Sequence, residues 1–307
     1  MLLFLTVIAI ISSSCSAGDA TLARPSLIAN AAPTDIVHYF GVGSNMLKSK
    51  LINRGLNGTT IDIIDFQPAC VKGHRLAFNM RGFPPLEPGM GALEPDIQGR
   101  QECHGALCTM HASEYEKVWL SEGGGAPKPG YEEIVVQAHA YGSDRAVPAL
   151  ALRARPHARL HVDACPSQRY MDILISGATE LGIEQQYIDE LESIQVQQVG
   201  SVLRFLAIHH LYLITSLFRL KMQGTVRALS WMLWRAYVPS TCSNVVKRWL
   251  GSVFTGVLLL PGASIGALIR LCLLISGTPP SPMLAVLAAA APSRRTLAAS
   301  PHPKNSA

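Results

Sequence analysis

The sequence contains few charged residues, and its second part contains no acidic ones. Asp, Glu, Lys and Arg make up 15% of the 307 residues, whereas about 25% is usual for soluble proteins. Between Gly200 and Ala307 there are eleven Lys and Arg but no Asp or Glu. All 21 acidic residues lie before Gly200, together with 15 basic ones, so the two parts carry net charges of −6 and +11. The chain therefore joins two physically different segments.

The motifs of the common cofactor-dependent and metal-dependent enzymes are also missing. The sequence has no HExxH and no CxxC, which are typical of zinc and redox sites. Met46 stands where a dinucleotide-binding loop that begins with Gly41 and Gly43 needs its third glycine, and no lysine of a phosphate-binding loop follows. Met46 also breaks the GxSxG pattern that a hydrolase would need around Ser44. We therefore expect no cofactor, no metal ion and no nucleic-acid partner.

The N-terminus begins with an apolar run that is followed by small residues, MLLFLTVIAIISSSCSAGDA. Cys15-Ser16-Ala17 fits a signal-peptide cleavage site, although no Lys or Arg precedes the apolar run. This pattern predicts a signal peptide over residues 1–20, a loose leader over 21–35, and a place in the secretory pathway or at a membrane. The alternatives are a hydrophobic helix that stays attached and a cytoplasmic protein. With secretion, Asn57-Gly58-Thr59 becomes a glycosylation site.

Residues 36–155 contain short apolar or alternating runs that are typical of β-strands. We expect strands within the segments 36–40, 71–80, 104–110, 131–141 and 146–154, a Pro/Gly loop at 81–89 and one helix at 111–123. Ser113 and Glu116 have the spacing of a capping box at the start of that helix. Because no helix separates the strands regularly, a barrel or curved sheet fits better than a doubly wound parallel sheet.

Two amphipathic helices follow the strands. Their apolar residues recur at helical spacing, at Tyr170, Ile173, Leu174, Ala178 and Leu181, and then at Ile183, Tyr187, Ile188, Leu191 and Ile194. The expected fold is therefore α+β, a small mixed barrel or curved sheet with flanking helices over residues 36–198.

The remaining residues, 199–307, form a basic apolar tail. The run from Leu250 to Ile269 is twenty residues long and uncharged, which is enough to span a bilayer, although Pro261 interrupts it. An alternative is a positively charged helix that lies on anionic lipid, and a further one is disorder. We expect membrane association through residues 200–276 and a disordered C-terminal end.

Two local features suggest a site for a small charged molecule. In YFGVGSNM, residues 39–46, two glycines, a serine and an asparagine follow an apolar strand; glycine allows a positive φ and a close approach of the backbone to a ligand. Glu122 lies at the end of the 111–123 helix, before Gly123-Gly124-Gly125. A carboxylate at that end of the helix dipole is unfavourable, and burial would raise its pKa further. The alternatives are a plain turn and an exposed glutamate.

Three segments, YFGVGSNM, WLSEGGG…PGYEEIVV and PSQRYMDILISGATELGIEQQYIDELESI, resemble the gamma-glutamylcyclotransferase family in order and spacing. The resemblance covers about residues 36–197, and the third segment is the most specific. The family signature at the strand end is usually YGSN; here Val42 replaces the tyrosine, whereas Gly43-Ser44-Asn45 is intact. The insert RGFPPLEPGMGALEP is also unlike the shortest family members.

The resemblance implies roles for particular residues. Glu122 would be the catalytic acid and base. The substrate would contact Tyr39, Phe40, Gly41, Val42, Gly43, Ser44, Asn45 and Tyr170. The substrate's own α-amine would attack its side-chain carbonyl to form 5-oxoproline and release an amine, so neither a cofactor nor an enzyme nucleophile is required. The alternatives are a cyclotransferase restricted to glutathione and a catalytically inactive binding domain on a membrane tail. The sequence does not determine an oligomeric state.

Overall fold

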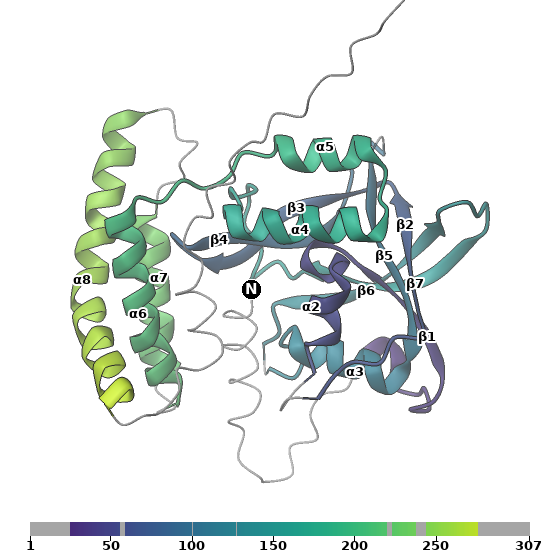
Figure 1. Cartoon of the computed structure of the whole chain (residues 1–307), viewed down its shortest axis with the longest axis horizontal. Helices are drawn as coiled ribbons and strands as arrows, with labels where there is room; N and C mark the ends of the chain where they lie inside the picture. The colour runs from purple at the N-terminus through teal and green to yellow at the C-terminus, as the bar shows by residue number, and fades with distance from the viewer. Residues whose placement is uncertain are drawn as a thin grey trace, which may run out of the picture.

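The computed structural model describes residues 25–55, 59–99, 101–126, 128–219, 223–237 and 244–275. The predicted signal peptide, Asn57 of the glycosylation sequon and the C-terminal end after residue 275 lie outside these residues. All the residues of the predicted site lie within them. In Figure 1 a strand-rich domain with covering helices occupies one side, and the helices of the C-terminal part stand beside it.

Five strands close into a barrel in the order β1-β5-β2-β6-β7. They are β1 (Ile36–Gly41), β2 (Asp65–Lys72), β5 (Glu102–His111), β6 (Tyr131–Ala140) and β7 (Ala146–Ala154). The neighbours pair antiparallel except β1 and β7, which are parallel and close the barrel. Closure removes the exposed sheet edges that an open sheet would leave unpaired. The expectation of an α+β fold with a small barrel is therefore confirmed.

A long hairpin of β3 (His74–Phe83) and β4 (Glu87–Pro95) forms a separate two-stranded sheet. The prediction of a Pro/Gly loop over 81–89 was wrong, because the strands continue to Phe83 and resume at Glu87. Glycine at positions 82, 89 and 91 is unusual in strands, and here each one lies in close contact with neighbouring backbone or side chains. The hairpin therefore brings its own backbone close to the barrel and to the helices beside it.

Three helices cover the barrel: α3 (Ala112–Ser121), α4 (Gln168–Leu181) and α5 (Gln185–Ser193). Helix α4 begins at Ser167, whose side chain accepts a hydrogen bond from the Tyr170 N–H, and ends at Gly182 in the left-handed conformation, as capping rules favour. The predicted capping box at Ser113 was wrong: α3 begins after His111, because the Ser113 N–H already donates to the Pro33 carbonyl.

Residues 25–35, within the predicted leader, pack against the barrel. A 3₁₀ turn, η1 (Ser26–Ile28), places Ile28 in the main apolar core. The backbone N–H and the hydroxyl of Ser26 both donate to a carboxylate oxygen of Glu133, at 2.6 and 3.0 Å. The Asp35 carbonyl accepts from the N–H of Ala112 at the start of α3. This segment is thus tied to the domain by apolar and polar contacts.

The basic tail contains α6 (Ser201–Arg219), α7 (Gln223–Ala236) and α8 (Val245–Ile275). Their apolar cluster includes Phe83 at the tip of the β3–β4 hairpin, and the Trp234 indole donates to the Gly82 carbonyl at 3.3 Å. The predicted uncharged run lies in α8. Within the described residues, only the window Val245–Ile269 is long and apolar enough to cross a bilayer by length and composition, and 28% of it is buried.

Candidate active site

The short turn after β1 forms one wall of the candidate site. It is a 3₁₀ turn, η2 (Gly43–Met46), and all four of its residues are buried. Gly43 has a φ of +62°, a left-handed conformation that strongly favours glycine. A Cβ at this position would lie 2.7 Å from the Tyr170 hydroxyl. The glycine is thus required both by its backbone angle and by the close approach of α4.

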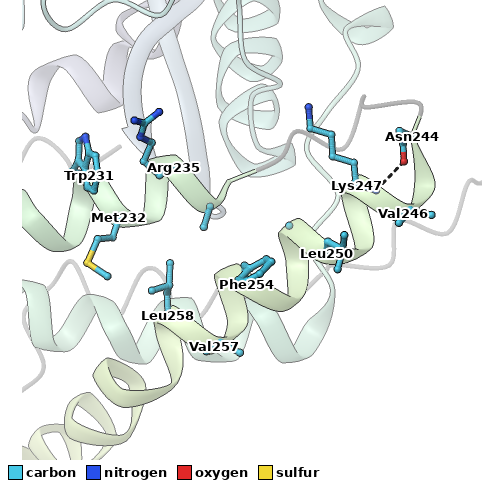
Figure 2. A pocket seen from close by; sticks show the side chains of 12 residues that line it. Trp231, Met232, Arg235, Asn244, Val246, Lys247, Leu250, Phe254, Val257 and Leu258 are labelled. Atoms are coloured by element: carbon cyan, nitrogen blue, oxygen red, sulfur yellow. Dashed lines mark hydrogen bonds between the residues drawn. The ribbon is translucent and has the colours of Figure 1, made fainter.

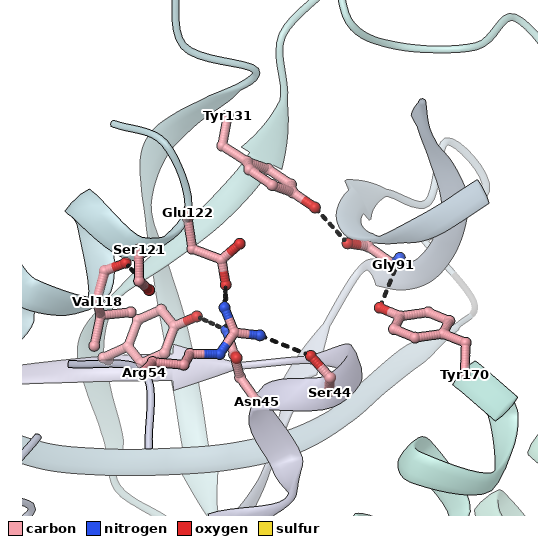
Figure 3. A network of polar contacts seen from close by, with 10 residues as sticks. Ser44, Asn45, Arg54, Gly91, Val118, Ser121, Glu122, Tyr131 and Tyr170 are labelled. Carbon is pink, nitrogen blue, oxygen red and sulfur yellow. Dashed lines mark hydrogen bonds and ion pairs between the residues drawn. The ribbon is translucent and has the colours of Figure 1, made fainter. Parts of the chain in front are cut away.

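The Glu122 carboxylate lies opposite this turn (Figure 3). Glu122 is the residue at which α3 ends, and Gly123, with a φ of +83°, lets the chain turn away there. The side chain is buried, with the whole residue 6% exposed. The Asn45 Nδ2 donates to its Oε1 at 3.1 Å. The strand-end turn and the helix-end glutamate, 77 residues apart in the sequence, therefore meet as the resemblance implied.

Arg54 is a member of this site that the sequence analysis missed. It follows the short helix α2 (Lys48–Ile52) and is 7% exposed. Its guanidinium forms an ion pair with Glu122 and donates to the Ser44 hydroxyl at 2.8 Å. A single arginine after a five-residue helix carries no motif. The general rule that a buried carboxylate is paired requires a cation but does not say which one.

Three tyrosine hydroxyls surround the same space. The Tyr39 hydroxyl accepts from Asn45 Nδ2 at 2.7 Å, the Tyr131 hydroxyl donates to the Gly91 carbonyl at 3.2 Å, and the Gly91 N–H donates to the Tyr170 hydroxyl at 2.9 Å. Burial raises the pKa of all three phenols, and the negative charge of Glu122 raises them further. The three hydroxyls therefore stay protonated near neutral pH. Those of Tyr39 and Tyr170 accept hydrogen bonds here and can donate their own hydrogens to a ligand, whereas the Tyr131 hydrogen is donated to the Gly91 carbonyl.

These groups enclose a small cavity. Its lining consists of Tyr39, Val42, Ser44, Asn45, Arg54, Met90, Gly91, Glu122, Tyr131, Leu152 and Tyr170. The free volume inside is about 20 Å³, roughly what one water molecule occupies. The Asn45 Oδ1 is buried and has no hydrogen-bond partner among the described residues. A larger molecule can enter only if a side chain that now fills the space moves.

Not every residue of the predicted site faces the cavity. Phe40 is fully buried, but in a separate apolar cluster with residues such as Val71 and Leu107, because alternate residues of a strand point to opposite faces. Gly41 and Gly43 contribute backbone to the turn, and Gly43 approaches Tyr170. Gly91 and Tyr131, which sequence reasoning did not select, take part instead.

Two curated fungal proteins match the chain. Gamma-glutamyl cyclotransferase gliK from Claviceps purpurea is 31% identical over 139 residues, which cover 44% of this chain and 61% of that protein. The protein of the same name from Aspergillus fumigatus is 26% identical over 177 residues, covering 50% and 62%. Over these residues the chain is similar to gamma-glutamyl cyclotransferases. It spans about three fifths of the length of these two relatives.

Solved structures add comparisons of the backbone alone. A gamma-glutamyl cyclotransferase superposes on this chain with a TM-score of 0.46 at 19% identity, covering 54% of this chain and 92% of the other. YkqA from Bacillus subtilis gives 0.43 at 18% identity, covering 53% and 56%. No protein-family model matches the chain.

Replacing Gly43 with Ala should weaken the binding of a molecule in this cavity. The added Cβ meets the Tyr170 hydroxyl at 2.7 Å, and the left-handed φ costs a non-glycine residue about 1–2 kcal/mol. Gly73→Ala is the matched control, because Gly73 has a similar φ of +67° but no atom within 4 Å of the added Cβ. We expect a loss of Tm in both variants, larger in Gly43→Ala because of the contact with Tyr170, and a rise in KM of about tenfold, about 1.4 kcal/mol, in Gly43→Ala alone. Equal KM values would make Gly43 a turn residue only.

Proposed function

We propose that the protein converts γ-glutamyl amines or γ-glutamyl amino acids into 5-oxoproline and the free amine, with Glu122 as the acid and base. The observation that carries this proposal is the buried Glu122 carboxylate, which faces the Gly43–Asn45 turn and pairs with Arg54. The names of the two fungal relatives support the same class of reaction.

The reaction needs little covalent chemistry from the protein. The substrate's α-amine attacks its own γ-carbonyl carbon, the C–N bond to the leaving amine breaks, and a five-membered lactam forms. Attack within one well-oriented molecule can provide about 7–11 kcal/mol of the barrier. No cysteine or histidine lines the described cavity, and none is needed, because the nucleophile belongs to the substrate.

The reaction requires a group that accepts protons from the attacking amine and returns them to the leaving nitrogen. An ion pair with Arg54 needs the ionised form of Glu122, and this form can take a proton from the substrate's α-ammonium group. The lactam nitrogen keeps only one of the three ammonium hydrogens, so two protons must leave it. Glu122 passes them in turn to the departing nitrogen, which is released as an ammonium group, and Glu122 ends as it began. Asn45 Oδ1, which lacks a partner in the described cavity, is an acceptor for the remaining ammonium hydrogens.

Arg54 gives the site a way to recognise the substrate's α-carboxylate. Its guanidinium is the only cationic group among the residues that line the described cavity, and guanidinium groups bind carboxylates in a two-pronged geometry. In our proposal the substrate carboxylate replaces Glu122 as the partner of Arg54, which opens space and releases Glu122 to act on the amine. The Tyr170 hydroxyl and the N–H groups of the turn are donors for the developing oxyanion.

The test is to incubate the full chain separately with γ-glutamyl-alanine, γ-glutamyl-lysine and glutathione, and to measure 5-oxoproline. Release from the dipeptides supports the general cyclotransferase, and release from glutathione alone supports the restricted one. A folded protein that binds these compounds without turnover would favour the inactive binding domain. The inactive binding domain remains a second candidate because Val42 lies in the cavity wall where the family signature has tyrosine.

A further inference from the structure

Helix α8 is apolar on both of its sides, but only one side is covered. The buried residues recur every three or four positions and therefore share one face: Gly251, Thr255, Leu259, Gly262, Ala263 and Gly266. A Cβ at Gly262 would lie 1.9 Å from the His210 ring, and one at Gly266 would lie 1.8 Å from the His209 carbonyl. This face is thus packed directly against α6.

The opposite side of α8 consists of large apolar side chains that are exposed. They are Val246, Trp249, Leu250, Val253, Phe254, Val257, Leu260, Ile265, Leu268 and Leu271. Between Trp249 and Ile269 the other exposed residues are Ser252, Pro261 and Ser264, none of which is charged. A helix that is apolar all round is normally buried on every side, and contiguous exposed apolar surface marks a binding site. This stripe therefore requires a partner.

Helix α7 widens the stripe into a groove (Figure 2). Trp231 and Met232 are 61% and 39% exposed, and together with Leu250, Phe254 and Val257 of α8 they line a groove of about 710 Å³. Arg235 and Lys247 line the same groove. We call the exposed stripe of α8 together with Trp231 and Met232 the outward face. Its large side chains are aliphatic and aromatic, and its basic residues lie at the edge.

The positive charge of this segment favours an anionic bilayer over a second copy of the chain as the partner of the outward face. Residues 200–307 carry eleven Lys and Arg and no Asp or Glu, so two copies of this face would repel each other. Anionic lipid headgroups attract clustered Lys and Arg, and an apolar stripe with tryptophan and flanking basic residues is typical of helices that lie in the membrane interface. Arg235, stacked on the Trp231 ring at 5.2 Å, combines both features.

The position of α8 in the fold decides how it would meet a bilayer. Helices α6 and α7 pack on the β3–β4 hairpin through Phe83 and Trp234, and α8 packs on α6 from the other side (Figure 1). If α8 crossed the bilayer, its partner helices and the hairpin tip would have to enter the hydrocarbon with it. We propose that the outward face is a docking surface for an anionic lipid bilayer, with α8 lying flat in the interface.

Vesicle sedimentation of the full chain tests the proposal. We expect binding to phosphatidylcholine vesicles that contain phosphatidylserine, a blue shift of tryptophan emission on binding, and much weaker binding to phosphatidylcholine alone. Phe254→Glu should weaken the binding about tenfold or more, since it removes an inserted ring and cancels one positive charge. The matched control is Ile97→Glu, which adds the same charge at a fully exposed residue of the turn after β4 and should bind as the unmodified chain does.

Three outcomes would overturn the proposal. The first is an absence of vesicle binding, or equal binding to neutral and anionic vesicles. The second is a dimer in light scattering that Phe254→Glu dissociates while vesicles are not bound, because the partner would then be a second copy. The third is resistance to both high salt and alkaline carbonate, which would show that α8 crosses the bilayer. Unchanged melting temperatures in both variants exclude unfolding as the cause.

Discussion

Replacing Glu122 with Gln is expected to reduce the rate of 5-oxoproline formation by about 10²–10⁴-fold, the usual effect of losing a general acid and base. The reason is chemical, because an amide of the same shape can no longer take the proton of the attacking amine and return it to the leaving nitrogen. The amide oxygen can still accept hydrogen bonds from Arg54 and Asn45, which Glu122 Oε1 accepts now. The variant should therefore remain folded, although it loses stability because the buried Arg54 charge no longer has an anionic partner.

The measurement is kcat on the best of the three γ-glutamyl compounds, with circular dichroism to establish folding. Glu180→Gln is the control, since Glu180 is an exposed residue of α4 and its replacement removes the same charge outside the site. Its kcat should equal that of the unmodified protein. A Glu122→Gln protein with near-normal turnover would show that another group moves the proton and would disprove the mechanism.

Replacing Arg54 with Met is expected to cause the largest loss of stability. The side chains of Arg54 and Glu122 are 4% and 8% exposed, and removing one partner of a buried ion pair leaves the other charge without compensation. Such a loss typically costs about 3–5 kcal/mol. The double variant Arg54→Met, Glu122→Gln should be more stable than Arg54→Met alone, because no unpaired charge remains, although it should be inactive.

Urea unfolding of the two single variants and the double variant measures this coupling. The control is Arg75→Met, because Arg75 forms an ion pair with Asp163 in which the side chains are 38% and 35% exposed; a pair of this kind contributes about 1 kcal/mol or less. A double variant no more stable than Arg54→Met would contradict the buried pair. If Arg54 also binds the substrate carboxylate, Arg54→Lys should raise KM more than it lowers kcat, because lysine keeps the charge but loses the two-pronged geometry.

The position of Arg54 also explains why the cavity is small. Its guanidinium lies between Ser44 and Glu122, in the space that a substrate must use. In the proposed reaction Arg54 takes no part in bond making or breaking. It is a buried cation whose partner changes from the Glu122 carboxylate to the substrate carboxylate. When no substrate is bound, the pairing of Arg54 with Glu122 avoids an unpaired buried charge. The binding of a γ-glutamyl compound would rearrange Ser44, Arg54 and Glu122.

Local sequence patterns determined the fold class and half of the candidate site. Short apolar or alternating runs predicted four of the five barrel strands, β1, β5, β6 and β7, but not β2 (Asp65–Lys72). Ser167 and Gly182 have the residue types that begin and end a helix. The glycines of the strand-end turn and Glu122 before Gly123 were recognisable because each depends on its immediate neighbours. The family resemblance joined them into one site.

Only the tertiary structure decided which distant groups complete that site. Arg54 and Glu122 are 68 positions apart, and Gly91 and Tyr170 are 79 positions apart. No periodic pattern in the sequence predicts either contact. The leader residue Ile28 enters the core, and the Ser113 N–H is bonded to Pro33 instead of starting a capping box, because the closed barrel brings these segments together. Local sequence patterns indicate which face of a strand or helix is buried. Closure of the barrel and the pairing of buried charges determine which distant residues contact that face.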